Sequence, residues 1–194
     1  MNPEMLNNTA LLVIDMQNGF INEESPLCIR GAKKTIPACS EIIDRCHQQK
    51  VPVFYVIREY REDGTDVERP RYNTWLKGGK PLSYGCDPEM SSDMPEEFQV
   101  LPEDTLILKP RYSAFFATEL DMILRRRGIR RLLLAGTTTP NCIRTTCYDA
   151  LSLDYDVVVL TDCTSSNTDE IQESNLRDME NAGAKLMSSQ EFIW

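Results

Sequence analysis

The apolar run Ala10-Leu-Leu-Val-Ile14, which ends at Asp15, indicates the fold class of this sequence. Such a run is typical of a strand that is buried on both faces, as in a parallel sheet covered by helices on each side. Further short apolar runs occur at residues 52–57, 105–108, 131–135, 157–160 and 184–187. Helical periodicity or helix-start signals lie between them, at residues 33–49, 118–127, 142–153 and 167–181. Asn167, with Glu170 three residues later, is expected to cap the last helix. The alternation predicts an α/β fold with three layers, α-β-α, around a doubly wound, six-stranded, mostly parallel sheet.

The whole chain, residues 1–194, is expected to form one domain, because its length and its 41% hydrophobic content suit a single core. Residues 59–104 break the alternation of strands and helices. This segment is polar, rich in glycine and proline, and longer than a loop that merely connects two elements of a compact domain. We interpret it as an excursion near the active site or at a subunit interface, since its scattered aromatic side chains argue against a disordered insert.

The net charge of −9, from 21 basic and 30 acidic residues, disfavours nucleic-acid binding, because such a chain repels a phosphate backbone. The arginines between residues 125 and 131 form a local basic cluster, which we interpret as a solvated helix end. No apolar stretch approaches the ~20 residues of a membrane span, and no export signal precedes the first apolar run. We therefore expect a cytoplasmic protein that binds neither membranes nor nucleic acids, with its seven cysteines reduced.

Three chemically reactive residues are predicted to lie where strands end. Asp15 follows the first strand, Lys109 follows the strand at 105–108, and Cys142 lies in the turn after 131–135, where a helix begins. In an open parallel sheet the carboxyl ends of the strands meet at one edge, and ligands bind there. We therefore expect these three side chains to lie close together.

This combination suits a cysteine hydrolase for a small carbonyl compound. An ammonium group and a helix N-terminus both favour the thiolate. A carboxylate within reach takes the thiol proton and later returns it to a leaving group. Backbone N–H groups of the turn Gly136-Thr-Thr-Thr-Pro-Asn-Cys142 are placed to hold an oxyanion. Taken singly, each residue also has a plain structural interpretation: Asp15 as a helix cap or turn residue, Lys109 as a surface ion-pair partner and Cys142 as a buried thiol.

Four blocks of the sequence resemble the isochorismatase-like cysteine hydrolase family. They are residues 11–20 (LLVIDMQNGF), 109–121 (KPRYSAFFATELD), 135–150 (AGTTTPNCIRTTCYDA) and 157–162 (VVVLTD). The blocks occur in the family's order, and the segment at 59–104 is the part that they leave unmatched. The resemblance implies the six-stranded α/β fold and a homo-oligomer, either a dimer or a tetramer.

The resemblance also implies roles for individual residues. Asp15, Lys109 and Cys142 correspond to the family's catalytic triad, in which the thiolate attacks an amide-type carbonyl and water later releases the acid from an acyl-enzyme. A cis peptide is expected between Thr137 and Thr138. The backbone N–H groups of Thr138 and Cys142 would then form the oxyanion hole.

Members of the family differ in metal use and in substrate. Nicotinamidases of the family bind a metal through an aspartate and two or more histidines, whereas this sequence has one histidine, His47, which we interpret as a surface or half-buried helix residue. We therefore expect no His-rich metal site and no cofactor. The stretch at 109–116 resembles members acting on carbamoyl and ureido compounds: N-carbamoylsarcosine amidase, ureidoacrylate amidohydrolase and biuret hydrolase. The prediction is a metal-independent cysteine hydrolase that cleaves a C–N bond of a small amide or carbamoyl compound through a thioacyl-enzyme.

Five further residues are expected to contact the substrate. They are Asn141, Arg111, Tyr112, Phe116 and Gln17. Asn141 stands where many members carry a different residue type, and it also suits a role in shaping the turn. Phe116 is equally suited to the core or to a dimer contact.

Two other functions stay open at this point. An isochorismatase-type hydrolase of an enol ether would need Asp15 and Lys109 but not Cys142. A non-catalytic scaffold would use a reactive Cys142 for redox sensing or for binding a partner, and Cys147 is either a resolving thiol for it or a buried helix residue. A dinucleotide-binding function is set aside, because no GxGxxG follows the first strand.

Overall fold

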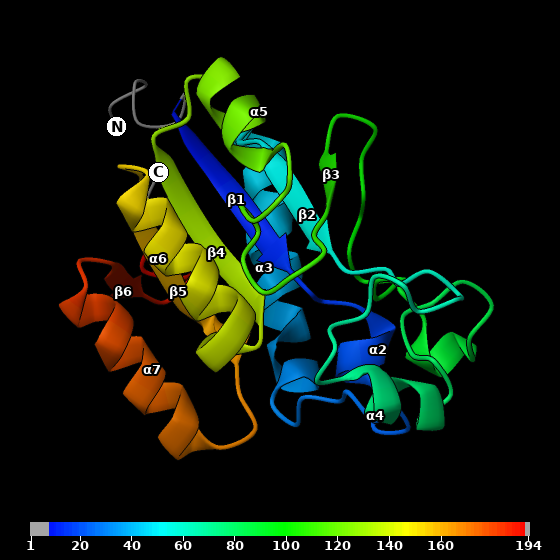
Figure 1. Ribbon diagram of the computed structural model, residues 1–194. Helices are drawn as coiled ribbons and strands as arrows, with labels where there is room; N and C mark the ends of the chain where they lie inside the picture. The colour runs from blue at the N-terminus through cyan, green and yellow to red at the C-terminus, as the bar shows by residue number, and fades with distance from the viewer. Residues whose placement is uncertain (1–7, 193–194) are drawn as a thin grey trace.

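The computed structural model describes residues 8–192, and in it six strands form one sheet (Figure 1). The strand order is β3-β2-β1-β4-β5-β6, and every neighbouring pair is parallel. The strands are β1 (Thr9–Ile14), β2 (Val53–Ile57), β3 (Thr105–Leu108), β4 (Arg131–Thr137), β5 (Asp156–Ser165) and β6 (Lys185–Met187). The predicted doubly wound, six-stranded sheet is therefore confirmed, and it is parallel throughout rather than mostly parallel.

Helices cover both faces of this sheet and form the outer layers (Figure 1). One face carries α3 (Ala32–Gln49), and the other carries α5 (Leu120–Arg126), α6 (Arg144–Ser152) and α7 (Asp169–Asn181). The side chains of β1 alternate between the two layers. Leu12 and Ile14 pack in the core under α5, α6 and α7, whereas Leu11 and Val13 pack in the core under α3. An uninterrupted apolar run is what such a strand requires, because both of its faces are closed to water.

Three helix starts differ from the sequence prediction. The helix predicted for residues 118–127 begins as α5 at Leu120, directly after Glu119. Thr168, not Asn167, caps α7, because its backbone is extended and its hydroxyl oxygen accepts a hydrogen bond of 3.3 Å from the N–H of Ile171. The side chain of Asn167 instead accepts a bond of 3.1 Å from the N–H of Arg30, just before α3. The helix predicted for residues 142–153 begins as α6 at Arg144, since a wider π-helical turn, η2 (Thr139–Ile143), precedes it.

The excursion at residues 59–104 has a small core of its own. It contains α4 (Tyr72–Lys77) and a 3₁₀ turn, η1 (Pro88–Met90), and it packs against α2 (Asn18–Ile21), which follows β1. Trp75 is buried there among Phe20, Tyr60, Val67 and Leu82, and its indole N–H donates to a backbone carbonyl at 2.9 Å. Tyr60 and Trp75 thus anchor this segment to α2, whereas Tyr84 is 83% exposed.

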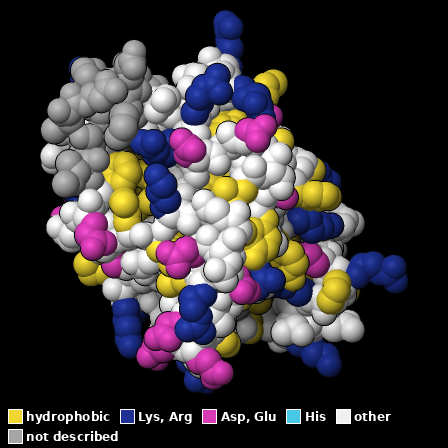
Figure 2. All heavy atoms as spheres, turned by 90° about the vertical axis from the view of Figure 1, so that its left-hand side faces the viewer, with side chains coloured by type: hydrophobic (Ala, Val, Ile, Leu, Met, Phe, Trp, Pro, Cys, Tyr) yellow, Lys and Arg dark blue, Asp and Glu magenta, His cyan; other side chains and the backbone are white. Residues whose placement is uncertain are grey.

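Charged side chains of both signs are interspersed on the face seen in Figure 2. Within the arginine cluster at 125–131, Arg125 pairs with Asp121 at 2.9 Å, and Arg131 pairs with Asp156 at 3.7 Å. Arg125 lies in the last turn of α5, where the helix dipole favours a cation. Within residues 8–192, no helix combines the length and the apolar character that crossing a membrane requires.

Candidate active site

Three side chains from three strand ends meet at the carboxyl edge of the sheet. The ammonium nitrogen of Lys109, after β3, lies 2.8 Å from Oδ2 of Asp15, after β1, and 3.5 Å from Sγ of Cys142, after β4. The third partner of this nitrogen is the carbonyl of Arg111, at 3.1 Å. Lys109 is fully buried, and Asp15 and Cys142 are 1% and 5% exposed. The structure thus brings together the three residues that the sequence singled out.

The backbone around Asp15 is shaped by its neighbours. Asp15 has a φ of 53°, in the left-handed region that aspartate tolerates better than most residues, and its N–H donates to the carbonyl of Val56 at 2.9 Å. Gly136 of β4 passes close by with a φ of 113°. A Cβ on this glycine would lie 2.0 Å from the carbonyl oxygen of Ile14, so no side chain fits there. The close approach of β4 to β1 sets the distance between the carboxylate and the turn at residues 136–142, which carries the predicted nucleophile Cys142 and is called the nucleophile turn below.

The nucleophile turn is tied to the end of β5 through a single carbonyl. The hydroxyls of Thr137, Thr138 and Thr139 all donate to the backbone oxygen of Ser165, at 3.4, 3.3 and 3.0 Å. The peptide bond between Thr137 and Thr138 is cis. Cys142 lies in the π-helical turn that follows. This threonine run therefore fixes the backbone that presents the sulfur.

Electrostatics keep the sulfur of Cys142 protonated at rest. Burial raises the pKa of this thiol to about 11, and the negative charge of Asp15 adds to the shift, while Lys109 and Arg58 oppose it. The expectation that an ammonium group would favour a resting thiolate is thus outweighed by burial and by the carboxylate. Nucleophilic attack requires a base that takes the proton. The carboxylate of Asp15 is within reach of it, because a side-chain hydrogen bond between this carboxylate and the thiol also contributes to the raised pKa.

Sequence reasoning missed Arg58, which directly follows β2. Its side chain is fully buried, and Asp15 and Cys142 are among the groups that raise its pKa, against a lowering by burial. One guanidinium nitrogen, Nη1, donates to Tyr60 and to Glu68, and the other, Nη2, donates to the carbonyl of Arg111 at 2.9 Å. The signal was available, because Arg58 follows its strand just as Asp15 and Lys109 follow theirs.

The residues predicted to contact substrate lie in different surroundings. Asn141 is exposed beside Cys142, and the rings of Tyr112 and Phe116 are 37% and 58% exposed. The guanidinium of Arg111 donates to the carbonyls of Asp66 and Pro110. Among the described residues, none of these four side chains forms a hydrogen bond or ion pair with Asp15, Lys109 or Cys142.

Gln17 has a structural task in place of the predicted contact. It is fully buried, and its amide nitrogen donates to the carbonyls of Arg58 and Ser92, at 2.8 and 2.9 Å. Its amide oxygen accepts from the N–H of Arg58 at 2.8 Å. Both N–H bonds of the amide are used, so Gln17 offers no free donor to a substrate. It joins the ends of β1 and β2 to the excursion at 59–104.

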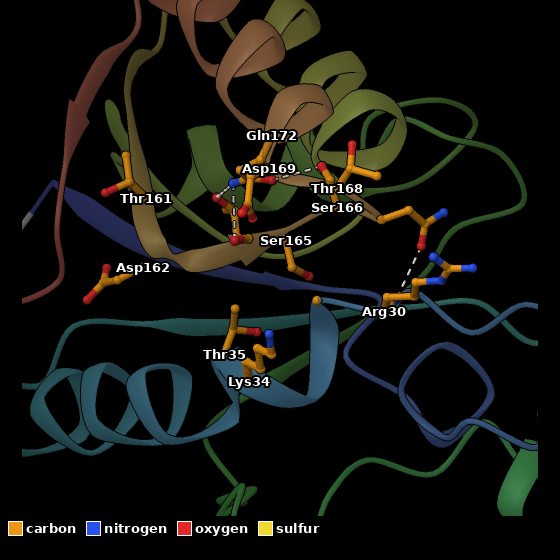
Figure 3. A pocket seen from close by; sticks show the side chains of 13 residues that line it. Arg30, Lys34, Thr35, Thr161, Asp162, Ser165, Ser166, Thr168, Asp169 and Gln172 are labelled. Atoms are coloured by element: carbon orange, nitrogen blue, oxygen red, sulfur yellow. Dashed lines mark hydrogen bonds between the residues drawn. The ribbon is translucent and has the colours of Figure 1, made fainter.

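A hollow of about 320 Å³ lies next to the nucleophile turn, and none of the three triad residues lines it (Figure 3). Arg30 and Lys34 border it from the start of α3, and Ser165 and Gln172 border it from β5 and α7. The amide nitrogen of Gln172 donates to the carbonyl of Thr164 at 3.1 Å, and its amide oxygen accepts from the hydroxyl of Ser166 at 2.8 Å. The walls of this hollow thus hold the end of β5, and through Ser165 they support the nucleophile turn.

Within residues 8–192, no group of three or more His, Cys, Asp and Glu side chains is arranged to hold a metal ion. His47 lies on α3, and its Nε2 is 3.1 Å from the carboxylate of Asp104, just before β3. This pair is at the amino edge of the sheet, opposite the triad. The single histidine therefore joins a helix to a strand away from the reactive sulfur.

Comparison with known proteins identifies the family. Residues 9–191 match the family model described as the isochorismatase domain. The chain belongs to the isochorismatase family and is a hydrolase of that family.

Individual relatives cover nearly the same length. A protein of Arabidopsis thaliana described as a probable inactive nicotinamidase is 39% identical, over 97% of this chain and 96% of its own. The ureidoacrylate amidohydrolase RutB of Agrobacterium fabrum is 31% identical, over 89% of this chain and 82% of its own. The crystal structure of an isochorismatase family protein from Desulfovibrio vulgaris superposes with a TM-score of 0.88 at 39% identity, over 94% of this chain and 95% of that one.

Proposed function

We propose that this protein is a metal-independent cysteine hydrolase that cleaves a C–N bond of a small amide or of a carbamoyl or ureido compound. The observation that carries the proposal is the position of the Lys109 ammonium, in contact with both the carboxylate of Asp15 and the sulfur of Cys142. A buried ammonium group that contacts both a buried carboxylate and a thiol is not expected in a merely structural core, because burying charge costs free energy.

Acylation begins with proton transfer. As Sγ of Cys142 attacks the carbonyl carbon, its proton moves to the carboxylate of Asp15, and the carbonyl electrons move to oxygen. The backbone N–H groups of Thr138 and Cys142 hold this oxyanion. The intermediate collapses when the C–N bond breaks and the amine leaves with the proton from Asp15. A thioacyl-enzyme stays on the sulfur.

Deacylation repeats these steps with water. Asp15 takes a proton as water attacks the thioester, and the sulfur leaves and recovers that proton, so that the acid or carbamic acid departs. Lys109 stays charged throughout and keeps the negative charge of the pair Asp15–Cys142 balanced wherever the proton resides.

The carbamoyl class is favoured over other amides by two observations. The stretch at 109–116 resembles the members that act on such compounds, and RutB, a relative at 31% identity, is named for ureidoacrylate. Of the residues expected to contact the substrate, Asn141 is exposed next to Cys142 in the sequence, and the ring of Tyr112 lies 5.8 Å from the guanidinium carbon of Arg58, which supports a role for both in binding a small polar substrate.

The proposal is tested with a panel of small amides and ureides, by measuring ammonia release from the wild type, Cys142→Ala and Cys147→Ala. Cys147 is a matched control, since it is a fully buried thiol on α6. We expect turnover in the wild type and in Cys147→Ala, and none in Cys142→Ala. Undiminished ammonia release by Cys142→Ala would show that Cys142 is not the nucleophile and would contradict the proposal. A wild type that labels at Cys142 but hydrolyses no member of the panel would favour a non-catalytic scaffold.

We also propose that the chain forms a homo-oligomer through the edge strand β3. Leu106 and Leu108 of this strand are 56% and 51% exposed and lie on the α3 side of the sheet, where Leu106 pairs with the buried Tyr55. An exposed apolar edge strand is a common subunit contact and an aggregation hazard when uncovered. Light scattering should give a mass above that of one chain, and Leu106→Glu should lower it. A monomeric wild type would contradict this proposal.

A further inference from the structure

We propose that Arg58 is a positioning residue that fixes Lys109 and adjusts the reactivity of the Cys142 thiol. Glu68, which belongs to the excursion at 59–104, offsets part of the positive charge of Arg58 in this network. The inference deepens the proposed function, on which it rests, because Cys142 is the proposed nucleophile. It assigns a task to a buried guanidinium and a buried carboxylate that the triad itself does not use.

The first observation is a shared acceptor. The backbone carbonyl of Arg111 accepts a hydrogen bond from Nζ of Lys109 at 3.1 Å and from Nη2 of Arg58 at 2.9 Å. Two cations therefore converge on one oxygen, which holds the ammonium at a fixed point between Asp15 and Cys142. A carbonyl with two charged donors is restrained more firmly than one with a single neutral donor.

The second observation is how completely Arg58 is enclosed. Its Nη1 donates to the hydroxyl of Tyr60 at 2.8 Å and forms an ion pair with Glu68. The hydroxyl of Tyr60 also donates to Glu68 at 2.6 Å, which locks the carboxylate. The Nε of Arg58 is buried and has no partner among the described residues. A buried cation with an unused donor is costly, and such costs concentrate at functional sites.

The third observation is the set of charges that face the sulfur from the neighbouring strands. Asp15 after β1 is negative, and Lys109 after β3 and Arg58 after β2 are positive. Lys109 and Arg58 both lower the pKa of the Cys142 thiol, against burial and Asp15, which raise it. Arg58 thus affects the Cys142 thiol in two ways: its own charge lowers the pKa of the thiol, and its hydrogen bond to the Arg111 carbonyl helps to fix Lys109.

The fourth observation concerns Glu68. Burial alone would raise the pKa of this carboxyl group, but Arg58 and the hydroxyl of Tyr60 lower it, so Glu68 stays ionised. Its negative charge offsets part of the field that Arg58 exerts on the active site. Because Glu68 belongs to the excursion, the packing of that segment controls how much positive charge the sulfur experiences.

These observations predict effects of opposite sign. Removal of the positive charge in Arg58→Met should reduce the thiolate fraction of Cys142, whereas removal of the negative charge in Glu68→Gln should increase it. A purely structural network would be damaged by either change in the same direction. We expect each change to alter the reactivity of Cys142 by about tenfold, the effect of one pKa unit.

The experiment measures alkylation of Cys142 by iodoacetamide, a neutral reagent, with the modified peptide quantified by mass spectrometry. Between about pH 7 and about pH 10 the rate follows the thiolate fraction, because the thiolate is the reacting form. Arg58→Lys keeps the charge and should retain most of the wild-type rate. The control is Arg125→Met, which removes an arginine that pairs with Asp121 on α5 and acts on neither Cys142 nor Glu68, and it should leave the rate unchanged.

Circular dichroism and thermal melting establish that each variant is folded before it is compared. Should Arg58→Met fail to fold, the faster alkylation of Glu68→Gln and the retained rate of Arg58→Lys carry the test. Equal rates in wild type, Arg58→Met and Glu68→Gln, or a decrease in both variants, would overturn the inference. The proposed function would survive that result if Cys142→Ala still abolished turnover. Intact turnover in Cys142→Ala would instead overturn the proposed function, whatever the alkylation rates of the Arg58 and Glu68 variants.

Discussion

The ammonium of Lys109 and the carboxylate of Asp15 form an ion pair of 2.8 Å that is almost closed to solvent, at 0% and 1% exposure. Two charges removed from water in this way stabilise each other but repay their desolvation only in part. The pair places a proton acceptor and a fixed positive charge next to the sulfur of Cys142, 3.5 Å from the ammonium. Its cost to stability is consistent with a site that is kept for chemistry.

Asp15→Asn should change the reactivity of the Cys142 thiol and the rate of turnover in opposite directions. Loss of the carboxylate removes a charge that raises the pKa of Cys142, so alkylation of the thiol should become faster. Turnover should nevertheless fall by about 10²–10⁴-fold, since the general base is lost. The variant should also lose about 3–5 kcal/mol of stability, because Lys109 is left buried without its counter-ion. Asp156→Asn, at an exposed ion pair with Arg131, is the control and should change none of the three. Slower alkylation in Asp15→Asn would contradict the assignment.

Stability at alkaline pH should depend on Cys142. The folded protein raises the pKa of this thiol from 9.0 to about 11, so the native state keeps the proton longer than the unfolded chain does. The associated stabilisation is fully present below pH 9 and is lost as the pH rises to about 11, by about 2–3 kcal/mol in total. Urea unfolding at several pH values should show this loss in the wild type and a shallower one in Cys142→Ala. Identical slopes in the two proteins would refute a strongly buried thiol.

Thr139→Val tests the anchoring of the nucleophile turn. The substitution removes the hydroxyl that donates to the carbonyl of Ser165 at 3.0 Å, and it keeps the shape of the side chain. We expect a loss of about 1 kcal/mol in stability and a clear decrease in kcat, because the turn presents Cys142. Thr168→Val removes the cap of α7 at a similar cost and should leave kcat unchanged. If both variants kept full kcat, the threonine anchors would have no part in catalysis.

Gly136→Ala tests the close approach of β4 to β1. A methyl group there would meet the carbonyl oxygen of Ile14 at 2.0 Å, and the φ of 113° is unfavourable for any side chain. We expect a loss of at least about 3 kcal/mol or failure to fold, because backbone atoms on both strands would have to move. Gly128→Ala is the comparison, since it also has a positive φ of 70° but faces open space. Its cost should be about 1 kcal/mol, measured by chemical denaturation of both variants.

The sheet could be predicted because its strands are short apolar runs and its helices have regular periodicity. The triad could be predicted because one rule, that parallel strands end at the same edge, gathers Asp15, Lys109 and Cys142. That rule also applies to Arg58, but its role depends on partners that the sequence does not reveal. They are Tyr60 and Glu68, in a segment that has no helical or strand periodicity, and the backbone carbonyl of Arg111 after β3.

Local details were harder to predict for a related reason. Asn167 and Thr168 are both good caps, and the choice between them depends on the contact of Asn167 with Arg30, 137 residues away in the sequence. Gln17 has the right residue type for binding a substrate, yet Arg58 and Ser92 occupy both of its N–H groups. In each case a distant backbone group decides the role of a polar side chain.

The most direct test of the central claim is to detect the acyl group on the sulfur. A substrate identified in the panel is mixed with the protein, quenched in acid during turnover, and digested for mass spectrometry. The account predicts that the peptide containing Cys142 gains the mass of the acyl group, and that Lys109→Met, which removes the charge in contact with this sulfur, greatly reduces the adduct. Turnover without any adduct, or an adduct on another cysteine, would contradict it.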